Sequence, residues 1–222
     1  MTRGILIAGN ESALFAAVAA EAAKRVEHFA TAFIPNHVSE SEGNKSAPVG
    51  DAHIPLLWNS ASPVSARTLI LSAERQLEHI NEAILVCAPP RVRKRPGDLA
   101  TADIVTMVDD QIKGWFFLVK ELTSIFKVRK TGTLVLVFSE LEGGGGKDDI
   151  PDLLGPSAVA SFRAFTQGLL AASQDEPFQI MGFSGSGDNA AFAAFIFKLM
   201  EESGRRNNGK LHRFGKLSFF GR

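Results

Sequence analysis

The chain has 222 residues, of which 45% are hydrophobic and 22% are charged, and its 24 basic and 24 acidic residues give a formal net charge of zero. This composition is typical of a globular protein, and the balanced charge excludes nucleic acid and an anionic membrane as partners bound through overall charge. The lone cysteine, Cys87, excludes an internal disulfide and favours the cytoplasm. No apolar run reaches the ~20 residues of a membrane span.

Short apolar runs alternate with longer helical patterns along the chain. Strands are predicted over 4–8, 29–34, 53–58, 83–88, 133–138 and 178–183, with a last strand within 210–220. Helices are predicted over 11–28, 62–78, 101–127, 157–172 and 188–202. Ser62, followed by Pro63, and Asp188 are typical residues for the start of a helix. The segments 36–51 and 140–149 are polar or glycine-rich and are predicted to be loops.

This alternation predicts the fold class. Strands joined by helices require parallel pairing, and strands that are apolar throughout, without alternation, lie in a sheet covered on both faces. We therefore expect an α/β protein, a doubly wound parallel sheet in a Rossmann-like three-layer sandwich, with residues 1–222 forming one domain.

The helix over 101–127 is apolar on two sides. One predicted stripe contains Ile104, Val108, Ile112, Trp115, Val119 and Leu122. Met107, Phe116 and Phe117 widen it toward a second face. A helix of this kind is either buried in the core or packed against another subunit as well.

Three segments in order carry a resemblance to a known family. Residues 108–118 are V-D-D-Q-I-K-G-W-F-F-L, residues 132–139 are G-T-L-V-L-V-F-S, and 160–172 is a helix. This arrangement resembles the central helix, the following strand and the active-site helix of the short-chain dehydrogenase/reductase superfamily, over essentially the whole chain. The resemblance implies a Rossmann-like fold related to enzymes that transfer hydride to or from NAD(P).

The resemblance maps the cofactor turns onto this chain. Gly9 stands at the first glycine of the family's T-G-x-x-x-G-x-G turn, whereas Ala13 and Phe15 replace the later glycines. Ala88 stands in the family's N-N-A-G segment. Glu11 adds a negative charge to a turn that binds pyrophosphate in the family. Gly9 and Ala88 are therefore predicted to be vestigial cofactor-binding residues, with no cofactor bound.

The catalytic set also departs from the family. Ser139 matches the family's serine and Gln111 matches its asparagine, but the positions of the Y-x-x-x-K pair fall near Gly155 and Val159. The chain contains 17 phenylalanines and no tyrosine, so the phenol that acts as the family's acid is missing. Ser139 and Gln111 are therefore predicted as vestigial catalytic residues.

The leading functional hypothesis is a non-catalytic subunit. In the family, the central and active-site helices form a four-helix bundle between subunits, and here Trp115, Phe116, Phe162 and Phe165 are candidate anchors. The expected partner is a second copy or an active short-chain dehydrogenase/reductase subunit. The alternative is a divergent oxidoreductase that binds NAD or NADP and uses Ser139, Gln111 or a bound water in place of tyrosine.

Other motifs give weaker hypotheses. The run Arg91-Val92-Arg93-Lys94-Arg95 is either a solvated loop or a site for an anionic ligand, such as coenzyme A or an acidic partner surface. Residues 182–187, G-F-S-G-S-G, lack the lysine of a phosphate-binding loop and are predicted to be a connector. The five histidines show no metal-ligand spacing, so no metal site is predicted. Asp109 and Asp110 point about 100° apart on a helix and cannot share one proton.

Overall fold

Seven strands of the described residues form one parallel sheet, in the order β3-β2-β1-β4-β5-β6-β7. The computed structural model describes residues 3–26, 28–34, 53–140, 150, 152–202 and 204–215. The strands are β1 (Ile5–Asn10), β2 (Phe29–Ile34), β3 (His53–Leu57), β4 (Glu82–Cys87), β5 (Thr133–Ser139), β6 (Gln179–Gly185) and β7 (Lys210–Phe214). The helices are α1 (Ala13–Ala23), α2 (Pro63–Gln76), α3 (Thr101–Val108), α4 (Gly114–Arg129), α5 (Leu154–Ala172) and α6 (Asn189–Glu201).

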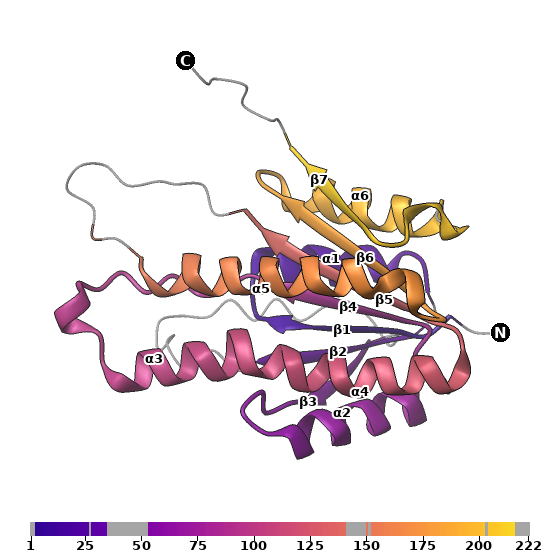
Figure 1. The fold of residues 1–222 in the computed structure, drawn as a ribbon, viewed down its shortest axis with the longest axis horizontal. Helices are drawn as coiled ribbons and strands as arrows, with labels where there is room; N and C mark the ends of the chain where they lie inside the picture. The colour runs from indigo at the N-terminus through magenta and orange to yellow at the C-terminus, as the bar shows by residue number, and fades with distance from the viewer. Residues whose placement is uncertain are drawn as a thin grey trace.

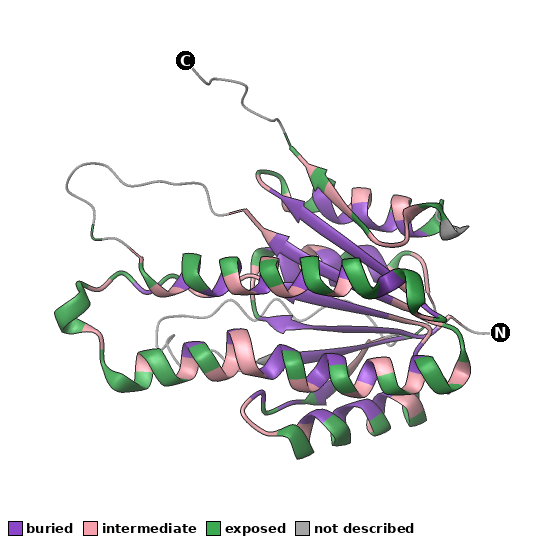
Figure 2. Cartoon of the chain, in the orientation of Figure 1, coloured by how far each residue is buried: buried purple, intermediate pink, exposed green. Residues whose placement is uncertain are grey.

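Helices cover both faces of the sheet, which gives the predicted three-layer α/β sandwich (Figure 1). α1 and α6 pack on one face, whereas α2, α4 and α5 pack on the other. Successive strand side chains point to opposite faces, so Leu6 enters one core and Ile7 the other. Figure 2 shows the buried residues along the strands and the exposed residues on the outer faces of the helices. The uninterrupted apolar runs of the sequence follow from this double burial.

Polar side chains set where the helices begin. Ser62 accepts a hydrogen bond from the Ser65 N–H and is followed by proline, so α2 begins where the sequence predicts. Asp188 accepts hydrogen bonds from two backbone N–H groups and begins α6. The helix predicted over 11–28 is shorter, because Ser12 is the residue that caps α1 and the helix ends at Ala23.

A π turn interrupts the long helix predicted over 101–127. The turn spans Asp109–Lys113, and the Gly114 N–H donates to the Asp109 carbonyl oxygen five residues earlier. Such turns insert one residue into an α-helix and change the direction of the side chains on either side. The sequence did not predict this turn.

The predicted apolar stripe is buried along α4 but partly exposed along α3. Trp115 and Leu122 are buried against the sheet, but Ile104 and Val108 are each 43% exposed. Figure 1 shows the reason, because α3 extends beyond the carboxyl edge of the sheet. The sheet therefore does not cover these two side chains.

The predicted loop over 36–51 and residues 141–149 of the loop over 140–149 lie outside the described residues. Within the described residues, no helix combines the length and the apolar character needed to cross a membrane.

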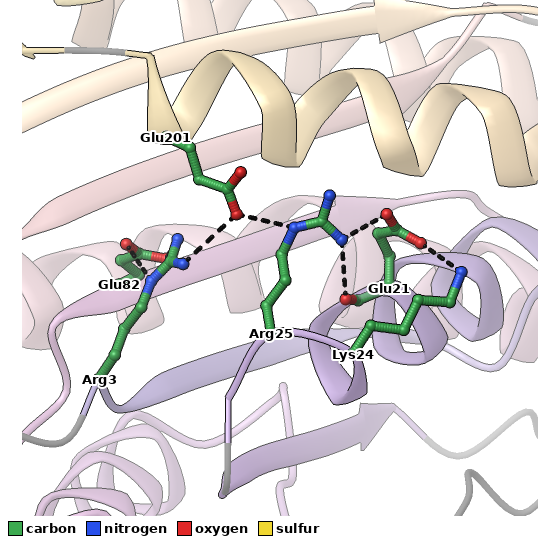
Figure 3. Close-up of polar contacts among 6 residues, drawn as sticks. All are labelled: Arg3, Glu21, Lys24, Arg25, Glu82 and Glu201. Atoms are coloured by element: carbon green, nitrogen blue, oxygen red, sulfur yellow. Dashed lines mark hydrogen bonds and ion pairs between the residues drawn. The ribbon is translucent and has the colours of Figure 1, made fainter.

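A network of ion pairs joins four elements at the amino edge of the sheet (Figure 3). Its members come from the ends of β1, β4, α1 and α6 and are Arg3, Glu82, Glu201, Arg25, Glu21 and Lys24. Glu201 is the link between the helices, since its Oε1 lies 2.8 Å from Arg25 Nε and 3.7 Å from Arg3 Nη1. Glu21 is the most buried carboxylate of the network, with a side chain that is 11% exposed. The hydrogen bond from Lys24 lowers the pKa of Glu21, with a further contribution from Arg25, and burial opposes this shift.

We expect Glu21→Gln to lower the free energy of unfolding by about 1–2 kcal/mol at pH 7, because Arg25 loses a charged acceptor in a half-buried place. The folded-state pKa of Glu21 is lowered, so its stabilising contribution is present above the unfolded-state pKa and is lost as pH falls through the folded-state value. The variant should therefore lose less stability than the wild type on acidification below about pH 4.3. Urea unfolding at several pH values measures both effects.

Glu202→Gln is the matched control, since the Lys198–Glu202 pair is 3.8 Å apart and both side chains are more than half exposed. Its effect should stay below about 0.5 kcal/mol. Equal losses in the two variants would contradict a structural role for Glu21.

Candidate functional site

The strand order reverses direction between β1 and β4. From β1 the chain adds β2 and then β3 on one side, and β4 to β7 follow on the other side. In doubly wound sheets, ligands bind at the carboxyl edge beside such a switch point. The predicted residues Gly9, Ala88, Gln111 and Ser139 all belong to segments at or near this edge, and this is the candidate site.

An aromatic ring fills the first turn of the site. A Cβ added at Gly9 would lie 2.6 Å from the Val86 carbonyl oxygen and 2.8 Å from Phe15 Cδ2, so only glycine fits here. Phe15 is 2% exposed, and its ring centroid lies 4.8 Å from that of Phe33. The space beside Gly9 is therefore occupied by the protein's own side chain.

The helix that follows this turn is capped by its own sequence. The Ser12 hydroxyl accepts a hydrogen bond of 3.1 Å from the Phe15 N–H. Glu11, one residue earlier, is exposed and carries a negative charge at the amino end of α1. A helix amino end attracts anions through its free N–H groups and its dipole. Ser12 takes one of these donors, and Glu11 places a carboxylate beside the rest.

Gln111 connects the central helix to the sheet through its side-chain amide. It lies in the π turn, is 1% exposed, and its Nε2 donates to Asn10 Oδ1 at 2.6 Å. Cys87 Sγ lies 4.0 Å from Gln111 Oε1, and burial raises the pKa of this thiol. Both ends of the Gln111 amide therefore contact protein groups at the ends of β1 and β4, and its geometry is that of a structural residue.

Asn10 is the site residue that the sequence analysis missed. It ends β1 and is 2% exposed. The available signal was a polar residue directly after the apolar run Ile5–Gly9, where the strand still continues. A second polar contact nearby ties the π turn to the loop after β3, since Ser60 donates to Asp110.

Ser139 ends β5 beside an ion pair. Arg163 Nη2 donates to Glu140 Oε1 at 2.9 Å, and its guanidinium lies 5.5 Å from the Phe138 ring centroid. Ser139 is half-buried. Both nearby charges are therefore engaged with each other, and neither is a free base for the serine hydroxyl.

Gly155 and Val159, which stand at the positions of the family's tyrosine and lysine, carry no side-chain proton donor. A Cβ at Gly155 would lie 2.5 Å from Asp152 Oδ2, and the Gly155 N–H donates to Asp152 Oδ1. Val159 is 7% exposed and packs in the core beneath α5. Neither position can donate a proton to a substrate.

A mainly apolar cavity of about 650 Å³ lies beside the carboxyl ends of β2 and β3, with Phe33, Leu57 and Trp58 in its wall. Among the described residues, no group of three or more His, Cys, Asp or Glu is arranged to hold a metal ion.

We expect Gln111→Leu to lower the free energy of unfolding by about 1–3 kcal/mol, because Asn10 Oδ1 loses its donor while still buried. Chemical unfolding measures the loss, and Gln76→Leu at the exposed end of α2 should change it by less than about 0.5 kcal/mol. A double variant with Asn10→Ala should lose less than the sum of the single losses. Strictly additive losses would contradict the direct bond.

Comparisons with known proteins agree with this architecture. No family profile matches the sequence, and no curated protein matches it. Solved structures do match. A short-chain dehydrogenase from Bacillus anthracis superposes with a TM-score of 0.73 and 12% identity, over 96% of this chain and 95% of that chain.

Two further structures are similar over the same extent. The NADH-dependent reductase A1-R′ complexed with NAD has a TM-score of 0.71 and 14% identity, over 96% of this chain and 94% of its own. Levodione reductase has a TM-score of 0.72 and 11% identity, over 95% of both chains. At these identities the likeness concerns the fold. The chain has the fold of the short-chain dehydrogenases/reductases, as the resemblance of its central helix, the following strand and the next helix predicts.

Proposed function

We propose that this protein is a non-catalytic subunit or assembly partner of an oxidoreductase. It acts by binding another chain through α4 and α5. The observation that carries the proposal is the outer face of α5. Its solvent-facing residues are Pro156, Ser157, Ala160, Ala164, Gln167, Gly168, Ala171 and Ala172. None of them is charged, although the solvent face of a helix normally carries charged residues.

The one charged residue of α5, Arg163, interacts with residues outside this face. Arg163 is the only charged residue of Leu154–Ala172, and it pairs with Glu140 and covers the Phe138 ring. Small residues at Ala160, Ala164 and Gly168 leave room for a second helix to approach closely. A Cβ added at Gly168 meets nothing within 4 Å, so the space outside this position is open.

Aromatic residues lie beside the small ones. Phe116 on α4 is 53% exposed, and its ring centroid lies 4.4 Å from that of the half-buried Phe165 on α5. Trp115 and Phe162, also predicted as anchors, are 1% and 2% exposed and pack within the core of the single chain. An interface on this face would therefore use Phe116 and Phe165, with Trp115 and Phe162 supporting them from below. Exposed aromatic residues are typical anchors of protein interfaces.

The site supports the non-catalytic part of the proposal. The chain has no tyrosine, Gly155 and Val159 carry no proton donor, and Phe15 fills the turn beside Gly9. The partner is a second copy of this chain or a related, active subunit, since both would present matching helices.

We expect Ala164→Glu to weaken association at least about tenfold, because the interface would then bury a charge without a partner. Gly168→Glu should act in the same way. Sedimentation velocity over a range of concentrations measures the shift toward the monomer. Ala20→Glu on the exposed face of α1 is the matched control, since it adds the same charge to a helical alanine on the opposite side of the sheet.

Two outcomes would contradict self-association through α4 and α5. One is a wild-type chain that sediments as a monomer at high concentration. The other is an Ala164→Glu variant with the same distribution of species as Ala20→Glu.

A second candidate function is a divergent oxidoreductase that binds NAD or NADP. The observation in its favour is the cavity beside β2 and β3 at the carboxyl edge, together with the NAD bound by the similar reductase A1-R′. Catalysis would then depend on Ser139 or a bound water.

The leading proposal predicts no saturable binding of NADH or NADPH up to millimolar concentration, because Phe15 and Glu11 leave no place for the pyrophosphate at the α1 turn. Quenching of the fluorescence of Trp58 and Trp115 measures binding, with an NADH-dependent reductase of the same fold as positive control. Binding in the micromolar range would favour the oxidoreductase instead.

A further inference from the structure

The loop between β4 and α3, residues 88–100, is held in place at three points. Val92 is 5% exposed and packs with Met107 of α3 and Ala158 of α5. The backbone of Arg93 forms an antiparallel bridge with Asp152, just before α5. These contacts join the loop to both helices beyond the carboxyl edge of the sheet.

The third point is an ion pair. Lys94 Nζ lies 2.6 Å from Asp103 Oδ2, which also accepts the Ala100 N–H at 3.0 Å. The hydrogen bond from Lys94 lowers the pKa of Asp103, and the backbone N–H adds to the shift. The charge of Lys94 is therefore paired within the protein, and this ion pair holds the loop against α3.

Two basic residues of the loop point outward. Arg91 and Arg95 are exposed, and the residues between them include Val92 and Lys94, which are anchored. Within the described part of the chain, Arg91 and Arg95 form no ion pair. Residues 88–100 contain one acidic residue, Asp98, against four basic ones, so the loop is basic although the chain as a whole is neutral.

An apolar residue of α3 lies next to this basic loop. Ile104 directly follows Asp103, the partner of Lys94, and is 43% exposed. We define the arginine surface as Arg91, Arg95 and Ile104. It combines two outward cations with an uncovered aliphatic side chain on a backbone that is already ordered, which lowers the entropy cost of binding.

We propose that the arginine surface binds an acidic, amphipathic segment of a partner protein, whose carboxylates pair with Arg91 and Arg95 and whose apolar side chains cover Ile104. Carboxylates are favoured because arginine binds them with two parallel hydrogen bonds, and the exposed Ile104 favours a peptide over a free anion. This inference rests on the proposed function, since it names the chemistry of the partner in an assembly.

The test uses two synthetic helical peptides with the same leucine stripe, one with glutamates and the other with lysines on the polar face. The full-length protein should bind the glutamate peptide and not the lysine peptide. Raising NaCl from about 50 mM to about 300 mM should weaken this binding, because exposed charges are screened. Fluorescence anisotropy measures both peptides.

Arg91→Glu with Arg95→Glu should weaken the glutamate peptide at least about tenfold, through lost attraction and added repulsion. Arg67→Glu with Arg75→Glu on the exposed face of α2 is the matched control and should bind like the wild type. Equal binding of both peptides, no binding of either, or equal loss in both double variants would overturn the proposal. Tighter binding of duplex DNA or inorganic phosphate than of the glutamate peptide would also overturn it. An effect of Ala164→Glu on sedimentation alone, with no peptide binding, would leave the assembly on α5 standing and remove only this surface.

Discussion

The packing of Phe15 against Gly9 shapes the first turn of the candidate site, and the proposed loss of cofactor binding depends on this contact. Gly9 has no room for a Cβ, because the Val86 carbonyl and the Phe15 ring already fill the space around it. In a dinucleotide-binding protein the glycines of this turn let the backbone approach a ligand, whereas here the missing Cβ of Gly9 leaves room for a buried aromatic ring. The carboxyl end of β1 is thus part of the hydrophobic core. At this end Asn10 is hydrogen-bonded to Gln111, which lies in the π turn between α3 and α4.

The sequence predicts the sheet well because burial on both faces leaves a simple signal. Strands such as Leu134–Phe138 are fully buried and uninterrupted, and Ser62 and Asp188 mark helix starts by local hydrogen bonds. The π turn leaves no such signal, since its hydrogen bond to Asp109 involves only the backbone. The residue pattern also carries no signal that α3 extends past the sheet, where Ile104 and Val108 are each 43% exposed.

From the sequence, only the location of the candidate site could be predicted, and not the contacts within it. Gln111 and Ser139 belong to the carboxyl-edge region expected from the element order, but their partners come from other strands and helices. Asn10 is 101 residues from Gln111 in the sequence, so no local pattern connects them. The same limit applies to the aromatic anchors, because adjacent helix residues point about 100° apart. Trp115 is buried while Phe116 is exposed, and spacing alone did not separate the two.

Charge placement then distinguishes the two faces through which the chain is proposed to bind. At the amino edge, cations and anions are paired with each other, so that network projects little field into solvent. On α5 the single cation, Arg163, is paired with Glu140, and the outer face is left uncharged. Arg91 and Arg95 have no ion pair among the described residues, so no carboxylate of the described part of the chain cancels their charges. The two proposed binding faces of this neutral protein therefore differ in charge: the face on α5 is uncharged, whereas the loop with Arg91 and Arg95 is basic.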